Sequence, residues 1–183
     1  MQTRATPVSP TSLERLNTAP AEEAVATLLT CLNSRHWARR LTSHRPYPDL
    51  PSLLAAADEA AYDLSPDDLT EALAAESLPP LPEDTYAAAH TALSAAYAAY
   101  EARFGHVFVI CLDGLGTEET LDHVLAGIRS RLTNDPEEER QVAADELRRL
   151  ARARLTGAVR GAGNCATSHR PPAPGIQDKP PPR

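Results

Sequence analysis

One extended apolar segment inside an otherwise helical pattern most constrains the fold of this 183-residue chain. Residues 104–114 have the sequence Phe-Gly-His-Val-Phe-Val-Ile-Cys-Leu-Asp-Gly, in which β-branched and aromatic side chains favour extended backbone. The sequence offers no second strand to pair with this run. Side chains, water or a bound ligand must therefore satisfy its backbone N–H and C=O groups. The segment is either a binding site or a buried connector between two helices.

Helix signals on both sides of this segment predict an all-α fold, a single-domain helical bundle over residues 11–159. Serine or aspartate followed by proline and acidic residues, as in Ser65-Pro66-Asp67-Asp68 and Asp135-Pro136, is typical of a helix start. We also expect Thr18 and Ser34 to cap helices. The expected helices after residue 50 span residues 53–62, 66–76, 85–103, 117–132 and 136–159, with the extended segment at about 106–112.

Two further patterns concern the core and the chain ends. Tyr86, His90, Leu93, Tyr97 and Tyr100 follow one another at intervals of three or four residues, which places them on one helix face and predicts a buried stripe. Residues 1–10 are polar and contain two prolines, so we expect a flexible N-terminus. Residues 160–183 are rich in proline and predict a disordered tail.

Composition argues against several classes of protein. A formal net charge of −7 does not suit a nucleic-acid-binding face. No apolar run reaches the roughly 20 residues that cross a bilayer, and residues 1–10 lack the features of a secretion signal. The cysteines, Cys31, Cys111 and Cys165, are scattered and odd in number, which argues against a disulfide framework. We therefore expect a cytoplasmic protein with no membrane or nucleic-acid partner.

Motifs that carry catalysis or metal binding are missing from the sequence. It contains no phosphate-binding glycine loop, no H-E-x-x-H zinc motif and no serine nucleophile elbow. None of its six histidines pairs with cysteines or carboxylates at metal-ligand spacing. We expect no metal site. From the residues alone, the prediction is a helical domain with a possible small-molecule pocket at the extended segment.

An ordered series of short motifs nevertheless resembles one enzyme family over residues 13–159. The series is Cys31-x-x-Ser34-x-x-Trp37-Ala38, Arg45-Pro46-Tyr47, Ala74-Ala75, Tyr100-x-x-x-Phe104-Gly105-x-x-Phe108-Val109-x-Cys111, Arg131-Leu132-x-Asn134, Glu139, Glu146 and Arg154-Leu155. It is similar to the 2-oxo-4-hydroxy-4-carboxy-5-ureidoimidazoline (OHCU) decarboxylases of urate degradation. The resemblance implies an all-helical, commonly dimeric fold that uses neither a metal nor an organic cofactor. It also implies a small-molecule substrate that loses CO₂ to give (S)-allantoin.

The resemblance carries over to particular positions of the site. It implies that an arginine of the final helix, Arg154, meets a carboxylate. It also implies that backbone groups of the extended segment hold the polar edges of the substrate. These substrate-binding positions are Phe108, Val109, Ile110, Cys111 and Leu112.

The chain departs from the family pattern at the position of the catalytic histidine. Where the family has Ala-His-Pro, this chain has Ala75-Glu76-Ser77, and the family's Ser-x-x-Glu-Gln segment has no counterpart. Three hypotheses follow. Glu76 could replace the histidine as acid or base in a divergent lyase, because burial can raise a carboxyl pKa. The scaffold could instead serve another small-molecule reaction, or it could be a non-catalytic module that binds a ligand or a partner chain.

Overall fold

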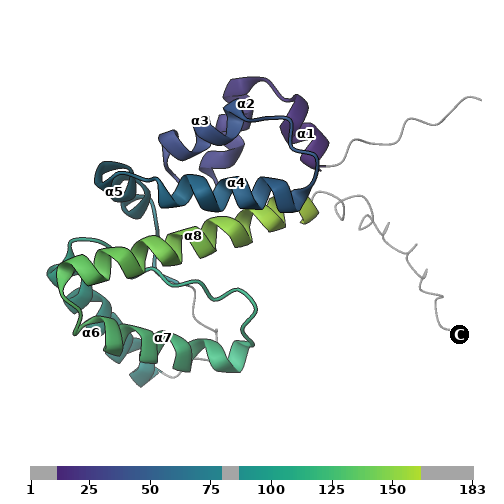
Figure 1. The fold of residues 1–183 in the computed structure, drawn as a ribbon. Helices are drawn as coiled ribbons and strands as arrows, with labels where there is room; N and C mark the ends of the chain where they lie inside the picture. The colour runs from purple at the N-terminus through teal and green to yellow at the C-terminus, as the bar shows by residue number, and fades with distance from the viewer. Residues whose placement is uncertain (1–11, 80–86, 162–183) are drawn as a thin grey trace, which may run out of the picture.

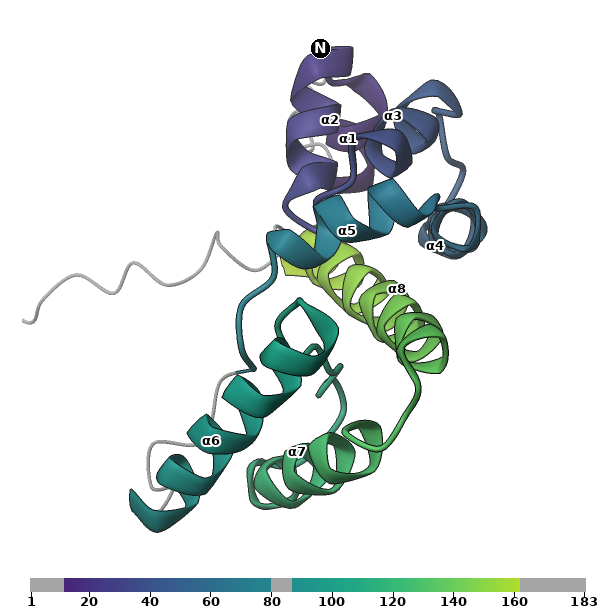
Figure 2. The same cartoon turned by 90° about the vertical axis from the view of Figure 1, so that its left-hand side faces the viewer.

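The computed structural model describes residues 12–79 and 87–161 and is all-α, as the sequence predicted (Figures 1 and 2). Within these residues the chain forms eight α-helices and no strand. The predicted flexible N-terminus lies outside the described residues, as does the tail from residue 162 onward. The helices are α1 (Ser12–Thr18), α2 (Ala21–Leu29), α3 (Arg35–Ser43), α4 (Leu50–Tyr62), α5 (Pro66–Ala74), α6 (Ala87–Phe104), α7 (Thr117–Arg131) and α8 (Pro136–Gly161).

The predicted caps at Ser34 and Ser65 are confirmed. The N–H of Trp37 donates to Ser34 Oγ at 3.3 Å, which begins α3. At the start of α5, the Asp68 N–H donates to Ser65 Oγ at 3.2 Å, and the Ser65 N–H donates to Asp68 Oδ2 at 3.1 Å. This reciprocal capping box satisfies two backbone donors that the helix itself leaves unpaired. Short local signals therefore fixed where these two helices begin.

The predicted cap at Thr18 is wrong. Thr18 is the last residue of α1, and its hydroxyl donates to the carbonyl of Glu14 at 2.8 Å. The N-cap position of α2 is occupied by Pro20, which makes no side-chain cap hydrogen bond. A threonine hydroxyl bonds equally well to the preceding turn of its own helix. Because α1 extends to residue 18, this competing bond is the one that forms.

A large hydrophobic core lies among α1 to α5 and α8, and the long helix α8 runs beside α4 (Figure 1). Trp37 is fully buried in this core, and its indole N–H donates to the carbonyl of Ala57 at 3.0 Å. We call this set the large core. Its buried members are Leu16, Ala24, Leu28, Cys31, Leu32, Trp37, Ala38, Leu41, Tyr47, Leu53, Leu54, Ala57, Ala60, Leu69, Ala72, Leu73, Val109, Ala143, Leu147, Ala151 and Leu155.

A second, small core lies between α6, α7 and the segment that joins them. Its buried members are Leu93, Tyr97, Tyr100, Phe108, Ile110, Val124 and Ile128. The predicted stripe on α6 is thus confirmed at Leu93, Tyr97 and Tyr100. It is wrong at His90, whose side chain is exposed and available to water. Tyr86 lies outside the described residues.

The extended segment between α6 and α7 separates the two cores. Residues 105–116 are non-helical, and Gly105 and Gly114 have φ values of 78° and 81°, in the region that favours glycine. Side chains alternate along the segment as in a strand. Phe108 and Ile110 belong to the small core, whereas Val109 belongs to the large core. The segment therefore packs against both cores at once.

No helix in the described part of the chain has both the length and the apolar character needed to cross a membrane.

Candidate small-molecule site between the end of α5 and α8

Two side chains bind the backbone of the extended segment, which has no strand partner within the described residues. Arg131 Nη1 donates to the carbonyl of Val109 at 2.6 Å. The N–H of Cys111 donates to Glu146 Oε2 at 2.7 Å. We predicted that side chains, water or a ligand would bind the backbone N–H and C=O groups of this segment. That prediction is confirmed for the Val109 carbonyl and the Cys111 N–H. Both bonds use charged side chains, which makes them stronger than bonds between neutral groups.

A buried polar network holds Arg131 in place. Glu139 is completely buried and accepts hydrogen bonds from Arg131 Nε at 2.8 Å and Nη2 at 2.6 Å. The Tyr100 hydroxyl also donates to Glu139 Oε1, and Asn134 Nδ2 donates to Glu139 Oε2 at 2.9 Å. Burial and the hydrogen bond to Glu139 together raise the pKa of Tyr100. We call these four residues the Tyr100 network; it positions the Val109 carbonyl through Arg131.

The predicted site residues Glu76 and Arg154 form a bidentate ion pair. Glu76 lies two residues after the end of α5, and Arg154 lies on α8. Arg154 Nη1 donates to Glu76 Oε1 at 2.7 Å, and Nη2 donates to Oε2 at 2.7 Å. The Glu76 side chain is only 8 % exposed, whereas that of Arg154 is 37 % exposed. The two parallel N–H···O bonds fit the planar guanidinium to the planar carboxylate.

Two cysteines lie near this ion pair. Arg154 Nη1 also donates to the carbonyl of Cys31 at 3.2 Å. Burial raises the pKa of the Cys31 thiol, and the charge of Arg154 partly offsets that effect. The hydrogen bond to Glu76 raises the pKa of Arg154, with smaller contributions from Cys31 and Cys111. Cys31, Glu76, Cys111 and Arg154 thus come together from four distant parts of the chain, and we call them the Arg154 site.

The guanidinium of the Arg154 site is a suitable group for binding a carboxylate. A guanidinium presents fixed, parallel donors that suit a carboxylate, and here an internal carboxylate already occupies them. Leu78, two residues after Glu76, is 45 % exposed to solvent. No group of three or more metal-ligating side chains lies together within the described residues.

The side chains of the other predicted substrate-binding residues point into different cores. Phe108 and Ile110 point into the small core and Leu112 packs against it, while Val109 points into the large core. Among the backbone groups of the segment, the Val109 carbonyl and the Cys111 N–H already bind Arg131 and Glu146. Contact of the remaining backbone groups with a ligand stays a prediction. Sequence reasoning named Arg131, Asn134, Glu139 and Glu146 only as part of a resemblance. Their anchoring of the segment had no local signal in the sequence.

A cavity lies beside α8 and shares Cys111 with the Arg154 site. It measures about 430 Å³ and involves Cys111 together with Arg149, Arg152 and His123. Arg149 donates to Glu146 Oε1 at 2.9 Å, and Arg152 donates to Asp58 Oδ2 at 2.5 Å. These arginines are therefore paired with carboxylates and do not merely complement the dipole of α8.

Comparison with known proteins places the chain in one family. The model of the OHCU decarboxylase family matches residues 17–83 and 80–156. Together these ranges include all four members of the Arg154 site. The chain belongs to the OHCU decarboxylase family. No curated protein sequence matches it.

Two crystal structures share the fold. The structure of (S)-allantoin synthase superposes with a TM-score of 0.66 at 22 % sequence identity, over 82 % of this chain and 54 % of that one. An OHCU decarboxylase crystallised in the presence of (S)-allantoin gives a TM-score of 0.60 at 22 % identity, over 75 % of this chain and 96 % of that one. This chain thus spans about half the length of the (S)-allantoin synthase.

Proposed function

We propose that this chain is an OHCU decarboxylase-like carboxy-lyase that converts OHCU to (S)-allantoin without a cofactor. The observation that carries the proposal is the bidentate pair of Glu76 and Arg154 beside Cys111 of the extended segment. This pair places one carboxylate binder and one group able to carry a proton in the same site. Membership of the family over residues 17–156 supports the choice of substrate.

The reaction itself needs little beyond positioning and a proton. Loss of CO₂ from the substrate leaves an electron pair on a carbon next to an imine-like and carbonyl-conjugated ring, which can hold the charge. The protein must orient the substrate, stabilise the developing charge and deliver a proton to one face of that carbon. Backbone groups of residues 108–112 are candidates for the orienting contacts.

In this mechanism Glu76 changes partners during the cycle. The carboxylate of the substrate competes with Glu76 for the fork of Arg154. The Glu76 carboxylate, displaced from the guanidinium, takes up a proton. The proton that it takes from water passes to the carbanion after CO₂ has left. Glu76, again ionised, returns to Arg154, and one proton has been consumed for each CO₂ released.

The direct test is stereochemical. Enzymatically generated OHCU is added to the purified protein, and formation of (S)-allantoin is followed by circular dichroism against the spontaneous reaction. We expect acceleration with a single enantiomer as product. Racemic allantoin at the background rate would contradict decarboxylase activity.

A substitution at Glu76 tests the proton donor. Glu76→Gln keeps the size of the side chain but cannot supply the proton, so turnover should fall by about a hundredfold or more. The matched control is Glu71→Gln, which changes a solvent-accessible carboxylate of α5 and should leave turnover unchanged. Equal turnover by the Glu76→Gln variant and wild type would remove Glu76 from the mechanism. Thermal unfolding of both variants checks that the fold is intact.

A second function has a specific observation in its favour. Both Nη atoms of Arg154 bind Glu76, so the site contains an anion of its own. A catalytically altered relative could use the same site to bind another carboxylate-bearing small molecule, or it could serve as an interaction module. Calorimetric titration with small organic carboxylates separates these cases. Binding without stereospecific turnover would favour the ligand-binding alternative.

A further inference from the structure

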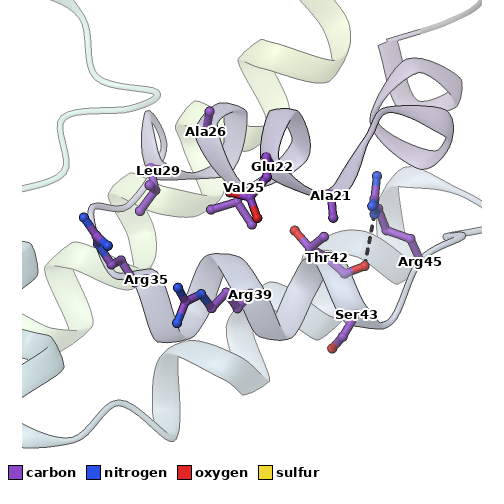
Figure 3. Close-up of a pocket in the computed structure, with 10 residues that line it drawn as sticks. All are labelled: Ala21, Glu22, Val25, Ala26, Leu29, Arg35, Arg39, Thr42, Ser43 and Arg45. Atoms are coloured by element: carbon purple, nitrogen blue, oxygen red, sulfur yellow. Dashed lines mark hydrogen bonds between the residues drawn. The ribbon is translucent and has the colours of Figure 1, made fainter.

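A groove separate from the Arg154 site runs between α2 and α3. It measures about 510 Å³, and Figure 3 shows the side chains that line it. Its α2 side is formed mainly by aliphatic residues, of which Val25 and Leu29 are half-buried and Ala21 and Ala26 are exposed. Val25 and Leu29 are one helical turn apart, so they form a short apolar strip along the groove.

The α3 side of the groove is positively charged. Arg35, Arg39 and Arg45 follow one another along it, whereas α2 contributes the single carboxylate of Glu22 (Figure 3). This is an excess of two positive charges in a chain whose formal net charge is −7. The groove therefore combines an apolar strip with a cationic edge.

The three arginines are poorly neutralised. Arg35 Nε lies 3.9 Å from a carboxylate oxygen of Glu71, and both side chains are well exposed to solvent, so this pair is weak. Arg45 donates only to carbonyl oxygens, including that of Leu16 at 2.6 Å. Arg39 is exposed and makes no ion pair with any described residue. Their charges are thus available to an anionic partner.

We propose that this groove docks an acidic amphipathic helix of a partner protein. Arg35 and Arg39 are separated by one helical turn, about 5–6 Å, which matches two carboxylates one turn apart on a facing helix. The apolar strip of Val25 and Leu29 would receive the leucine-like side chains between them, the recognition mode in which a helix lies in a groove. Charges spread along the groove suit an elongated partner, because a compact anion would meet only one or two of them.

The probe is a dye-labelled synthetic helix of about 15 residues, with leucines one turn apart on one face and glutamates one turn apart beside them. A peptide of the same composition in scrambled order is the control for charge alone. Binding to the full-length protein is followed by fluorescence anisotropy. We expect binding of the patterned peptide that weakens as salt increases and at least about tenfold weaker binding of the scrambled one.

Three variants locate the contact. Arg39→Glu reverses a charge in the groove and should weaken binding by about tenfold or more. Ala26→Trp changes no charge but fills the groove from an exposed position of α2, and it should weaken binding to a similar degree. Arg129→Glu makes the same charge change at an exposed position of α7 and should bind like the wild type.

Several outcomes would overturn the proposal. These are absence of binding up to millimolar peptide, equal binding of the scrambled peptide, or full binding by both Arg39→Glu and Ala26→Trp. Sedimentation velocity tests whether a second copy of this chain occupies the groove. If the wild type is a dimer that Ala26→Trp converts to a monomer, the groove holds a second copy of this chain instead of a partner helix. The test is independent of turnover at the Arg154 site.

Discussion

The large and small cores are stabilised in different ways. The large core contains 21 buried residues, mostly aliphatic, from six helices and their connecting segments, and apolar packing suffices to explain its cohesion. The small core contains only seven, and three of them are aromatic. The rings of Tyr100 and Phe108 pack edge to face with their centroids 5.1 Å apart. The guanidinium of Arg131 lies 4.6 Å from the centre of the Phe108 ring. The small core therefore depends on polar groups to a degree that the large core does not.

The connection between the two cores also relies on polar side chains. The Tyr100 network connects α6 and α7 to Glu139 of α8, and Glu146 of α8 binds the N–H of Cys111. Apolar packing adds Val109, which lies in the large core. Buried charge pairs of this kind are costly to break, because removing one partner leaves the other unpaired away from water. The connection is thus specific in geometry but vulnerable to single substitutions.

The largest expected effect comes from removing the buried carboxylate of this network. Glu139→Ala leaves the guanidinium of Arg131 buried without its partner, and we expect the free energy of unfolding to fall by about 3–5 kcal/mol. The control is Glu138→Ala at the neighbouring exposed position, which should change the free energy of unfolding by less than about 0.5 kcal/mol. Urea titration measures both. A loss below about 1 kcal/mol for Glu139→Ala would mean that the small core is stable without the network.

A smaller, local effect tests whether the two cores open independently. Leu93→Ala deletes a fully buried side chain of the small core and should lower the opening free energy of α6 and α7 by about 2–3 kcal/mol. Hydrogen exchange should then accelerate in these helices and remain slow in α4. Leu28→Ala, in the large core, should accelerate exchange throughout. Equal acceleration in α4 after Leu93→Ala would show that the chain opens as a single unit.

The smallest effect belongs to the cap of α5, at the surface of the large core. Hydrogen bonds from Ser65 lower the pKa of Asp68, so its stabilising contribution is present above the ordinary pKa of about 3.9 and is lost as the pH falls below it. Asp68→Asn should cost about 0.5 kcal/mol at pH 7. The difference from wild type should shrink below about pH 4 and at high salt. A difference that stays constant down to pH 2 would contradict this role.

The sequence predicted those parts of the fold that depend on short-range chemistry. Ser34 and Ser65 cap helices because each hydroxyl meets a backbone N–H only three residues away. The two glycines and the β-branched run between them identified the extended segment, and strand-like alternation at Phe108 and Val109 follows from backbone geometry alone. Thr18 shows the limit of the same logic, because two local hydrogen bonds compete for one hydroxyl.

The parts that sequence could not predict join residues far apart in the chain. Glu76 and Arg154 are separated by 78 positions, and their pairing depends on how α5 and α8 pack. The resemblance implied a carboxylate partner for Arg154 but did not identify it as Glu76. The Tyr100 network likewise joins α6, α7 and α8, and its members have no distinctive spacing. Such contacts become visible only when the helices have been placed.

The position of α8 has a consequence for synthesis on the ribosome. α8 is the last described helix to emerge, yet it supplies Leu147 and Leu155 to the large core and Glu139 to the Tyr100 network. Until α8 leaves the exit tunnel, the apolar face of α4 is exposed to solvent and Arg131 lacks its ion-pair partner Glu139. A nascent chain that stops short of residue 136 would therefore present these surfaces to chaperones, and the large core and the Tyr100 network would be completed together once α8 has left the tunnel.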